Sequence, residues 1–297
     1  MAAPRASALR FCAIICAMPQ NTPARRRFRM LIRRPESQID LAEAALCIAW
    51  EDQGVGDPRA ALRELDTIAE RAKPRITGLT RPPNIVGALN GYLFDELGFH
   101  GNTWSYSDPA NSFLDRVLAT RAGLPITLSV IYIEVGRRLG LPIVGLALPG
   151  HFLARYMVPG DDIFIDPFNS GRLWSQSECE AQVAGFYGSV TPALIEQIMA
   201  PPAKRDILAR MLRNLKNTYV ESGDLVRAAA AVERIILIEP DNLQELRDRG
   251  LLRARLGQIH AALEDLDRYA RLAPHAPDLA QIRQHARALA ERLAKGN

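Results

Sequence analysis

GLPITLSVIYIEVGRRLGLP, the segment from Gly123 to Pro142, contains a helix start, an apolar run and a helix stop. Pro125 stands at the start, because proline is favoured at the first helical position. Gly140 follows the run, and glycine commonly ends a helix. A helix that is apolar on most sides is buried inside a domain. The segment therefore predicts a central helix from Pro125 to Leu139.

Helices are expected before this segment and strands after it. Capping signals at Asp40 and at Asp57 begin two helices, and a third follows over residues 85–97. The runs 143–148, 152–158 and 163–165 are short and apolar, and the turns between them contain Pro and Gly, a pattern typical of antiparallel strands. Helices followed by strands in one core predict an α+β domain, here over residues 30–200.

The C-terminal part of the chain repeats itself with a period of 34 residues, which is the period of the tetratricopeptide repeat. Corresponding positions are Gly223 and Gly257, Ala228 and Ala262, and Pro240 and Pro274. We therefore expect two tetratricopeptide repeats over residues 205–297, closed by a capping helix over 278–295. Such repeats predict a module that binds a protein or peptide partner.

The formal net charge is +4, but residues 1–34 carry eight arginines and no acid. Without them, 29 basic residues (37 less 8) face 33 acidic ones, a net charge of −4. The domains are therefore not basic, and we do not expect nucleic acid as a partner. A DNA-binding regulator would depend on the arginine-rich segment alone. We interpret residues 1–29 as a disordered or over-extended basic extension, with Met30 as the true start.

The cysteines indicate a reducing compartment. Cys12, Cys16, Cys47 and Cys179 show no CxxC spacing, which is typical of inert cytoplasmic thiols. No segment is long enough to span a membrane, and no cluster of His, Cys, Asp or Glu has the spacing of metal ligands. We therefore expect a cytoplasmic protein with no cofactor, no metal and no membrane partner.

His151 and Asp166 lie on two neighbouring expected strands. A four-residue turn over 157–160 would place them directly opposite each other, whereas a turn over 158–161 would shift the register by two. A carboxylate beside a histidine fixes the tautomer of the imidazole ring. The two residues are therefore either a structural pair that orients the hairpin or part of a functional site.

Four segments together resemble the transglutaminase-like superfamily of the papain-like clan, and most closely the bacterial Sir-type family, which joins this domain to C-terminal tetratricopeptide repeats. The segments are FDELGFHGNTWSYSDPANSFLDRVL (94–118), GLPITLSVIYIEVGRRLGLP (123–142), PGHFLARY (149–156) and FIDPFNSGRL (164–173). With the repeats, the resemblance covers roughly residues 31–293. Trp104 and Ser107 depart from it, because the family tends to show a charged residue and a second aromatic there.

The resemblance implies a nucleophilic cysteine at the start of a buried helix, a histidine on a strand and an aspartate on the next strand. His151 and Asp166 match the last two. The cysteine position falls at or beside Pro125, and no cysteine lies between Cys47 and Cys179. The nucleophile of the superfamily is therefore missing from this sequence.

Our first hypothesis is a non-catalytic, regulatory or protein-binding protein, a pseudoenzyme that keeps the cleft of its superfamily. The residues expected to line or bind in the cleft are Asn102, Tyr106, Asp108, Asn111, Pro125, Thr127, Phe152 and Asn169. The plainer interpretation of the polar residues among 102–112 is that they only tie down a long loop.

The alternative is a hydrolase or acyltransferase that uses Ser129 or Thr127 as nucleophile, His151 as base and Asp166 to orient the base. A serine inside an apolar helix more often bonds to the backbone than to a substrate. The position of the Ser129 hydroxyl therefore separates the two hypotheses. Glu134, in the same helix, is expected to pair with the arginines that follow it.

Overall fold

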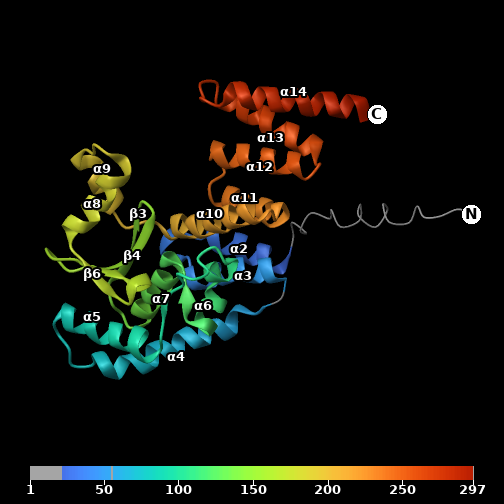
Figure 1. Cartoon of the computed structure of the whole chain (residues 1–297). Coiled ribbons are helices and arrows are strands. Elements are labelled where there is room, and N and C mark those ends of the chain that lie inside the picture. The colour runs from blue at the N-terminus through green and yellow to red at the C-terminus, as the bar shows by residue number, and fades with distance from the viewer. Residues whose placement is uncertain (1–21, 55, 297) are drawn as a thin grey trace, which may run out of the picture. The chain divides into compact units, whose positions relative to one another are not determined.

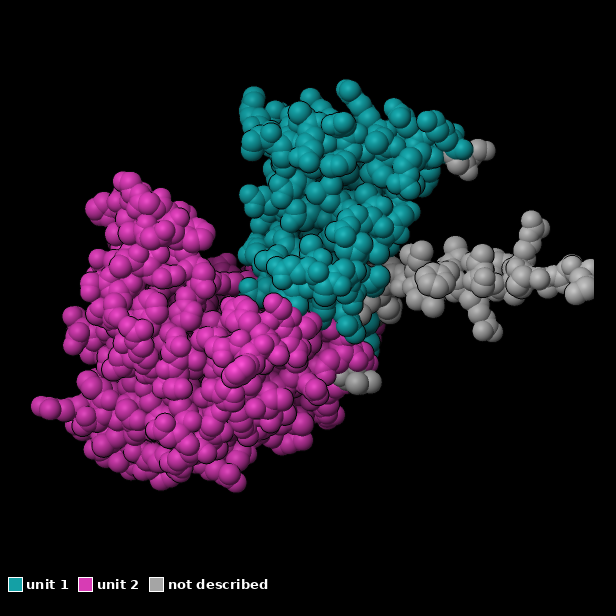
Figure 2. Space-filling model, in the orientation of Figure 1, with its two compact units in different colours: residues 1–23, 212–297 teal, residues 24–211 magenta. Residues whose placement is uncertain are grey.

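The computed structural model describes residues 22–54 and 56–296, which form two compact units (Figure 1 and Figure 2). The α+β unit covers residues 24–211 and is magenta in Figure 2. The repeat unit contains residues 212–296 and is teal. A mixed helix-and-strand unit followed by an all-helical unit is the predicted order.

The predicted central helix is α7, Pro125–Arg138. It begins at Pro125 and ends just before Gly140, whose φ of +71° is easily adopted by glycine. Every residue from 125 to 136 is buried. The helix packs against α3, α4, α6, β3 and β4, so its all-round apolar surface is explained by its central position (Figure 1).

The helices before α7 form the rest of the helical layer. They are α2 (Pro23–Ile32), α3 (Leu41–Gln53), α4 (Pro58–Ile76), α5 (Pro82–Asn90) and α6 (Leu114–Thr120), with a π-helix at Gly91–Glu96. As predicted, Asp40 caps α3, and its carboxylate accepts a hydrogen bond of 2.8 Å from the Glu43 amide. A short parallel pair, β1 (His100–Gly101) with β2 (Ala122–Gly123), holds the long loop beside the start of α7.

The first helix corrects a predicted boundary. Residues 23–29 belong to α2, in which Phe28 and Leu31 are fully buried and Arg25 pairs with the buried Glu51. The prediction that residues up to 29 form an unfolded extension is therefore wrong for this part. The run of arginines suggested disorder, but one arginine is a core residue with an acidic partner. Residues 1–21 lie outside the described part of the chain.

The predicted strands form one antiparallel sheet in the order β3 (Ile143–Leu148), β4 (His151–Tyr156), β5 (Ile163–Asp166) and β6 (Arg172–Trp174). Strand β6 was not predicted. Between β4 and β5, Ala154 lies opposite Ile165 and Tyr156 opposite Ile163, which corresponds to a turn over 158–161. The simpler register, with His151 directly opposite Asp166, is wrong. The Asp162 carboxylate accepts a hydrogen bond of 2.8 Å from the Val158 amide and stabilises the observed turn.

Helices α8 (Gln176–Tyr187) and α9 (Pro192–Met199) complete the α+β unit. Residues of the sheet and of α8 share a buried apolar cluster beneath these helices. Its members are Leu146, Leu148, Leu153, Phe164, Cys179 and Val183. The cluster fixes α8 against the sheet near the ends of β3 and β4.

The repeat unit consists of the end of α10 (Lys204–Ser222), followed by α11 (Leu225–Ile238), α12 (Leu243–Arg255), α13 (Ile259–Leu272) and α14 (Leu279–Gly296). Gly223 and Gly257 make the turns between helices with φ of +80° and +75°, and Ala228 and Ala262 are fully buried where helices cross. The units divide within α10, after Met211, because the first turns of α10 bond to the α+β unit. Among the described helices, none is both long and apolar enough to cross a membrane.

Candidate functional site

His151 and Asp166 meet although they are not directly opposite in the sheet. The Nε2 atom of His151 lies 2.8 Å from Oδ2 of Asp166, with the carboxylate as acceptor. Residues on one face that are offset by two positions in neighbouring strands remain within reach of long side chains. The observed register therefore brings the pair together diagonally.

The Asp166 carboxylate is fully buried and accepts several hydrogen bonds. Its Oδ1 accepts from the amides of Phe168 and Asn169, and its Oδ2 accepts from the Asn169 side chain at 2.8 Å. Burial by itself would raise the pKa of Asp166, but the bonds from His151 and Asn169 outweigh it and hold that pKa below the ordinary value of 3.8. Asp166 is therefore a charged anchor for the His151 ring.

Two aromatic rings contact His151, and a third contacts one of these two. Trp174 of β6 stacks on His151, with ring centroids 5.6 Å apart and planes 18° apart. Phe168 meets the same imidazole edge to face at 6.3 Å, and Tyr106 meets Phe168 at 6.1 Å. The His151 side chain is only 14% exposed as a result. Trp174 was missed from the sequence, because β6 is too short to show an alternating pattern.

Neither predicted hydroxyl can reach a substrate. Ser129 is fully buried and donates a hydrogen bond of 3.2 Å to the carbonyl oxygen of Phe152. Thr127 is also fully buried, and its Oγ1 has no hydrogen-bond partner within the described chain. The predicted role of Ser129 or Thr127 as nucleophile is therefore wrong. Both face the packed core instead of an open site.

The described cysteines are also enclosed. Cys47 and Cys179 are free thiols, and both are fully buried. Burial raises the pKa of each thiol to about 12. A thiol with such a pKa is protonated at neutral pH and is a poor nucleophile. Cys12 and Cys16 lie outside the described residues.

The residues predicted to line a cleft are divided between core and surface. Those in the core are Asn111, Pro125, Thr127 and Phe152, whose burial contradicts a role as cleft-lining side chains. Those at the surface or partly exposed are Asn102, Tyr106, Asp108 and Asn169. Asn102 and Asn111 bond to each other at 3.0 Å and to backbone groups of their loop. The side-chain amides of Asn102 and Asn111 thus hold the loop in place, which is the structural role considered as the plainer interpretation.

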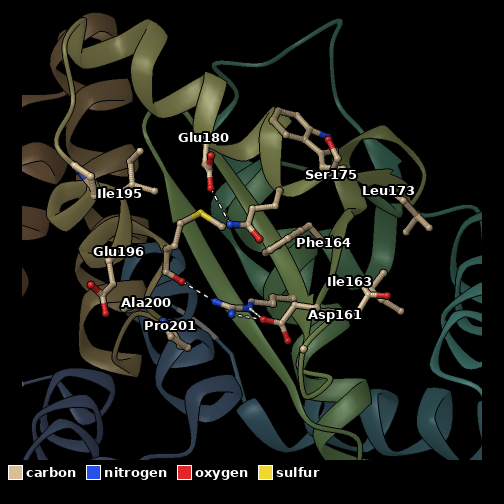
Figure 3. Close-up of a pocket in the computed structure, with 17 residues that line it drawn as sticks. Asp161, Ile163, Phe164, Leu173, Ser175, Glu180, Ile195, Glu196, Ala200 and Pro201 are labelled. Atoms are coloured by element: carbon tan, nitrogen blue, oxygen red, sulfur yellow. Dashed lines mark hydrogen bonds and ion pairs between the residues drawn. The ribbon is translucent and has the colours of Figure 1, made fainter.

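A groove of about 1100 Å³ lies between strands β4 to β6 and helices α8 and α9 (Figure 3). None of the predicted cleft residues lines it. Trp174, Leu173 and Ile195 provide apolar surface. The Trp174 ring also stacks on His151 and has the Arg172 guanidinium 5.7 Å from its centroid. The charged groups that line it are the Arg155 guanidinium and the carboxylates of Asp161, Asp162, Glu180 and Glu196.

The charges of the groove are unbalanced. Arg155 donates to Asp162 at 2.8 Å and to the Met199 carbonyl at 2.7 Å, so its charge is already matched (Figure 3). Glu180 and Glu196 stand on the helical side in the same view. Three carboxylates therefore remain without a cationic partner among the residues that line the groove.

Comparison with known proteins identifies the two units. Residues 59–213 match the family model described as the transglutaminase-like superfamily, and residues 215–287 match a tetratricopeptide repeat model. A UPF0162 protein of Xylella fastidiosa is 36% identical over 252 residues, which cover 84% of this chain and 90% of that protein. The chain belongs to the transglutaminase-like UPF0162 family.

Two further likenesses of this chain cover less of it or are weaker. F-box only protein 21 of Mus musculus is 31% identical over 185 residues, 58% of this chain and 27% of that protein. The crystal structure of menin superposes with a TM-score of 0.40 at 12% identity, covering 88% of this chain and 72% of menin, too weak to support an inference. The predicted superfamily and repeats are confirmed, whereas none of these names is the Sir-type name.

Two further observations concern possible metal ligands and a buried acid. Within residues 22–54 and 56–296, no group of three or more His, Cys, Asp or Glu side chains is placed to hold a metal ion. Glu134 is buried in α7 and pairs with Arg137 at 2.9 Å and Arg138 at 2.6 Å, as predicted. The carboxylate of Glu134 is therefore paired with arginines of its own helix.

Proposed function

We propose that this protein is a non-catalytic, cytoplasmic binding protein, in which the transglutaminase-like unit recognises a peptide segment and the repeats bind a second protein. The observation that carries the proposal is the nucleophile position. Pro125 occupies the start of α7, and the nearby hydroxyl of Ser129 is bonded to a core carbonyl. A histidine and an aspartate without an activated nucleophile do not support acyl transfer.

In this proposal, His151 and Asp166 are positioning residues. The Asp166 carboxylate holds the His151 ring, and that ring supports one face of Trp174. Trp174 lines the groove of Figure 3, so the pair fixes the apolar surface that a ligand meets. Rigid aromatic surface contributes strongly to binding because little side-chain entropy is lost.

The groove suits a peptide that carries apolar and basic side chains. Its volume of about 1100 Å³ exceeds that of typical small-molecule pockets, roughly 300 to 1000 Å³. Leu173 and Ile195 can accept apolar side chains, while Glu180 and Glu196 would attract lysine or arginine. Tetratricopeptide repeats are generally protein-interaction modules, which supports a second protein partner for residues 215–287.

Two experiments test the proposal. The purified full chain is first assayed for hydrolysis of peptide amides and esters and for acyl transfer to amines. Activity that His151→Ala abolishes would overturn the non-catalytic assignment and revive the hydrolase or acyltransferase hypothesis. Absence of turnover in both proteins is the expected result.

The second experiment measures binding of an array of basic peptides and of acidic peptides matched in length and apolar content. The double variant Glu180→Gln/Glu196→Gln should weaken binding of the basic set. Glu70→Gln is the matched control, because Glu70 is exposed on α4 away from the groove. Equal binding of both peptide sets by the wild-type protein contradicts the assigned ligand class.

A further inference from the structure

A second, smaller pocket of about 220 Å³ lies at the hairpin turn that precedes His151. The end of β3 and the turn Pro149-Gly150 form one wall, and Ile198 of α9 contributes to the lining. Phe186 and Tyr187, the last residues of α8, contribute two aromatic side chains. The guanidinium of Arg210, from α10, completes the lining. The groove of Figure 3 shares none of these residues.

Arg210 has no acidic partner within the described chain. Its Nη2 donates to the carbonyl oxygens of Leu148 and His151, each at 2.8 Å, and these are its hydrogen bonds to described residues. Its Nε and Nη1 groups make none. Burial lowers the pKa of Arg210, because a partly desolvated cation without a carboxylate is costly. Holding the turn therefore uses one nitrogen of the three. The Phe152 ring, with its centroid 5.5 Å from Cζ, contacts the guanidinium, but no carboxylate among the described residues matches its charge.

The lining indicates the kind of anion that would match this charge. No lysine, histidine or second arginine lines the pocket, so Arg210 is the one cationic residue of its lining. A single cation fits a monoanion such as a carboxylate better than a doubly charged phosphate. The planar guanidinium also matches the two oxygens of a carboxylate in geometry.

The aromatic residues indicate what the carboxylate is attached to. Phe186 is 65% exposed and Tyr187 52% exposed, and their rings meet edge to face at 5.0 Å. Paired exposed aromatics beside a partly buried charge are typical of a contact site rather than of a solvated surface. A pocket of about 220 Å³ is smaller than typical drug-sized sites, roughly 300 to 1000 Å³, and suits about one amino-acid residue.

We propose that this pocket binds the C-terminal residue of a peptide or protein chain, with the terminal carboxylate on Arg210 and an apolar side chain against Phe186 and Tyr187. A C-terminal residue carries both groups on one Cα atom. An internal aspartate or glutamate has the carboxylate without an apolar group beside it. The pocket is separate from the groove, so this assignment stands even if the groove binds no basic peptide.

The decisive comparison needs no variant. A fluorescein-labelled tetrapeptide of three alanines and a final leucine is titrated with the full chain as the free acid and as the C-terminal amide, by fluorescence polarisation. We expect the acid to bind at least about tenfold more tightly, because charge-assisted bonds are much stronger than neutral ones. Equal affinity for acid and amide overturns the proposal.

Variants then locate the site. Arg210→Gln should reduce binding of the acid to the level of the amide, and Arg210→Lys should restore part of the difference. Arg210 also holds the hairpin turn, so an unfolded Arg210→Gln protein would not decide the matter. The double variant Phe186→Ser/Tyr187→Ser avoids this problem, because both side chains are exposed.

The double variant should weaken both peptides by about fivefold or more while the preference for the acid remains. Leu173→Ser is the matched control, since Leu173 is 50% exposed but lines the larger groove. Binding that is lost in Leu173→Ser and kept in the double variant would place the peptide in that groove and refute the assignment. Binding that is lost in the double variant alone supports it.

Discussion

The ion pair between Arg25 and Glu51 provides the sharpest test of where the folded chain begins. The two side chains are 3% and 1% exposed, and they join α2 to α3. Replacing Arg25 by methionine leaves the Glu51 carboxylate buried without its arginine. Breaking a buried pair in this way typically costs about 3 to 5 kcal/mol. That is a large part of the roughly 5 to 15 kcal/mol that stabilises a typical domain.

The same helix supplies a matched control. Arg27 pairs with Glu43, but these side chains are 40% and 16% exposed. Solvent-exposed pairs contribute about 0.2 to 1 kcal/mol, so Arg27→Met should be nearly neutral. The double variant Arg25→Met/Glu51→Met removes both buried charges together. It should recover most of the stability that Arg25→Met loses.

Tryptophan fluorescence during urea unfolding measures these differences. Trp50, Trp104 and Trp174 all lie within residues 24–211, so the signal reports the α+β unit alone. The free energy of unfolding is compared at constant m-value. A loss in Arg25→Met no greater than in Arg27→Met would refute the claim that α2 is part of the core.

Three further predictions concern protonation and packing. Because the pKa of Asp166 is lowered, its contribution to stability is fully present above the ordinary pKa of 3.8 and is lost as pH falls through the lower folded value. Asp166→Asn should therefore lower the unfolding free energy most above pH 4. A difference from the wild type that grows in acid would contradict this. Gly250→Ala should destabilise the repeat unit by about 1 to 3 kcal/mol, because an added Cβ would lie 2.7 Å from Leu266. Circular dichroism during thermal unfolding measures this change. An unchanged transition would show that the contact between Gly250 and Leu266 is less tight than described. Cys47 and Cys179, with pKa values of about 12, should not react with a thiol reagent at pH 8 until urea unfolds the chain. The measurement uses a variant in which the N-terminal cysteines are replaced by serine. Rapid labelling of the folded protein would contradict the burial of both thiols.

Much of the site could be foreseen, but its surroundings could not. His151 and Asp166 could be identified because His151 begins an apolar run after a turn and Asp166 ends the next run. Trp174 and Arg210 were not, because one lies on a three-residue strand and the other on a helix that is distant in sequence. The expected cleft was misplaced for a related reason. Side chains such as Thr127 and Phe152 are polar or aromatic in the sequence, and only packing shows that they face the core.

Local patterns determined the architecture of this protein. The proline and glycine around the segment 125–139 determine its helix through backbone geometry, and the 34-residue period determines the repeats through one recurring helix pair. The sequence alone also shows that no cysteine lies between Cys47 and Cys179. These features depend on neighbours in the chain, so they can be read without a structure.

Long-range packing decided the rest. The β4–β5 register depends on the Asp162 carboxylate bonding to its own turn, and it makes the His151–Asp166 contact diagonal. The burial of Arg25 depends on Glu51 in another helix, and the unmatched charge of Arg210 depends on which side chains fail to approach it. Contacts of this kind join residues far apart in sequence, and no periodicity or composition encodes them.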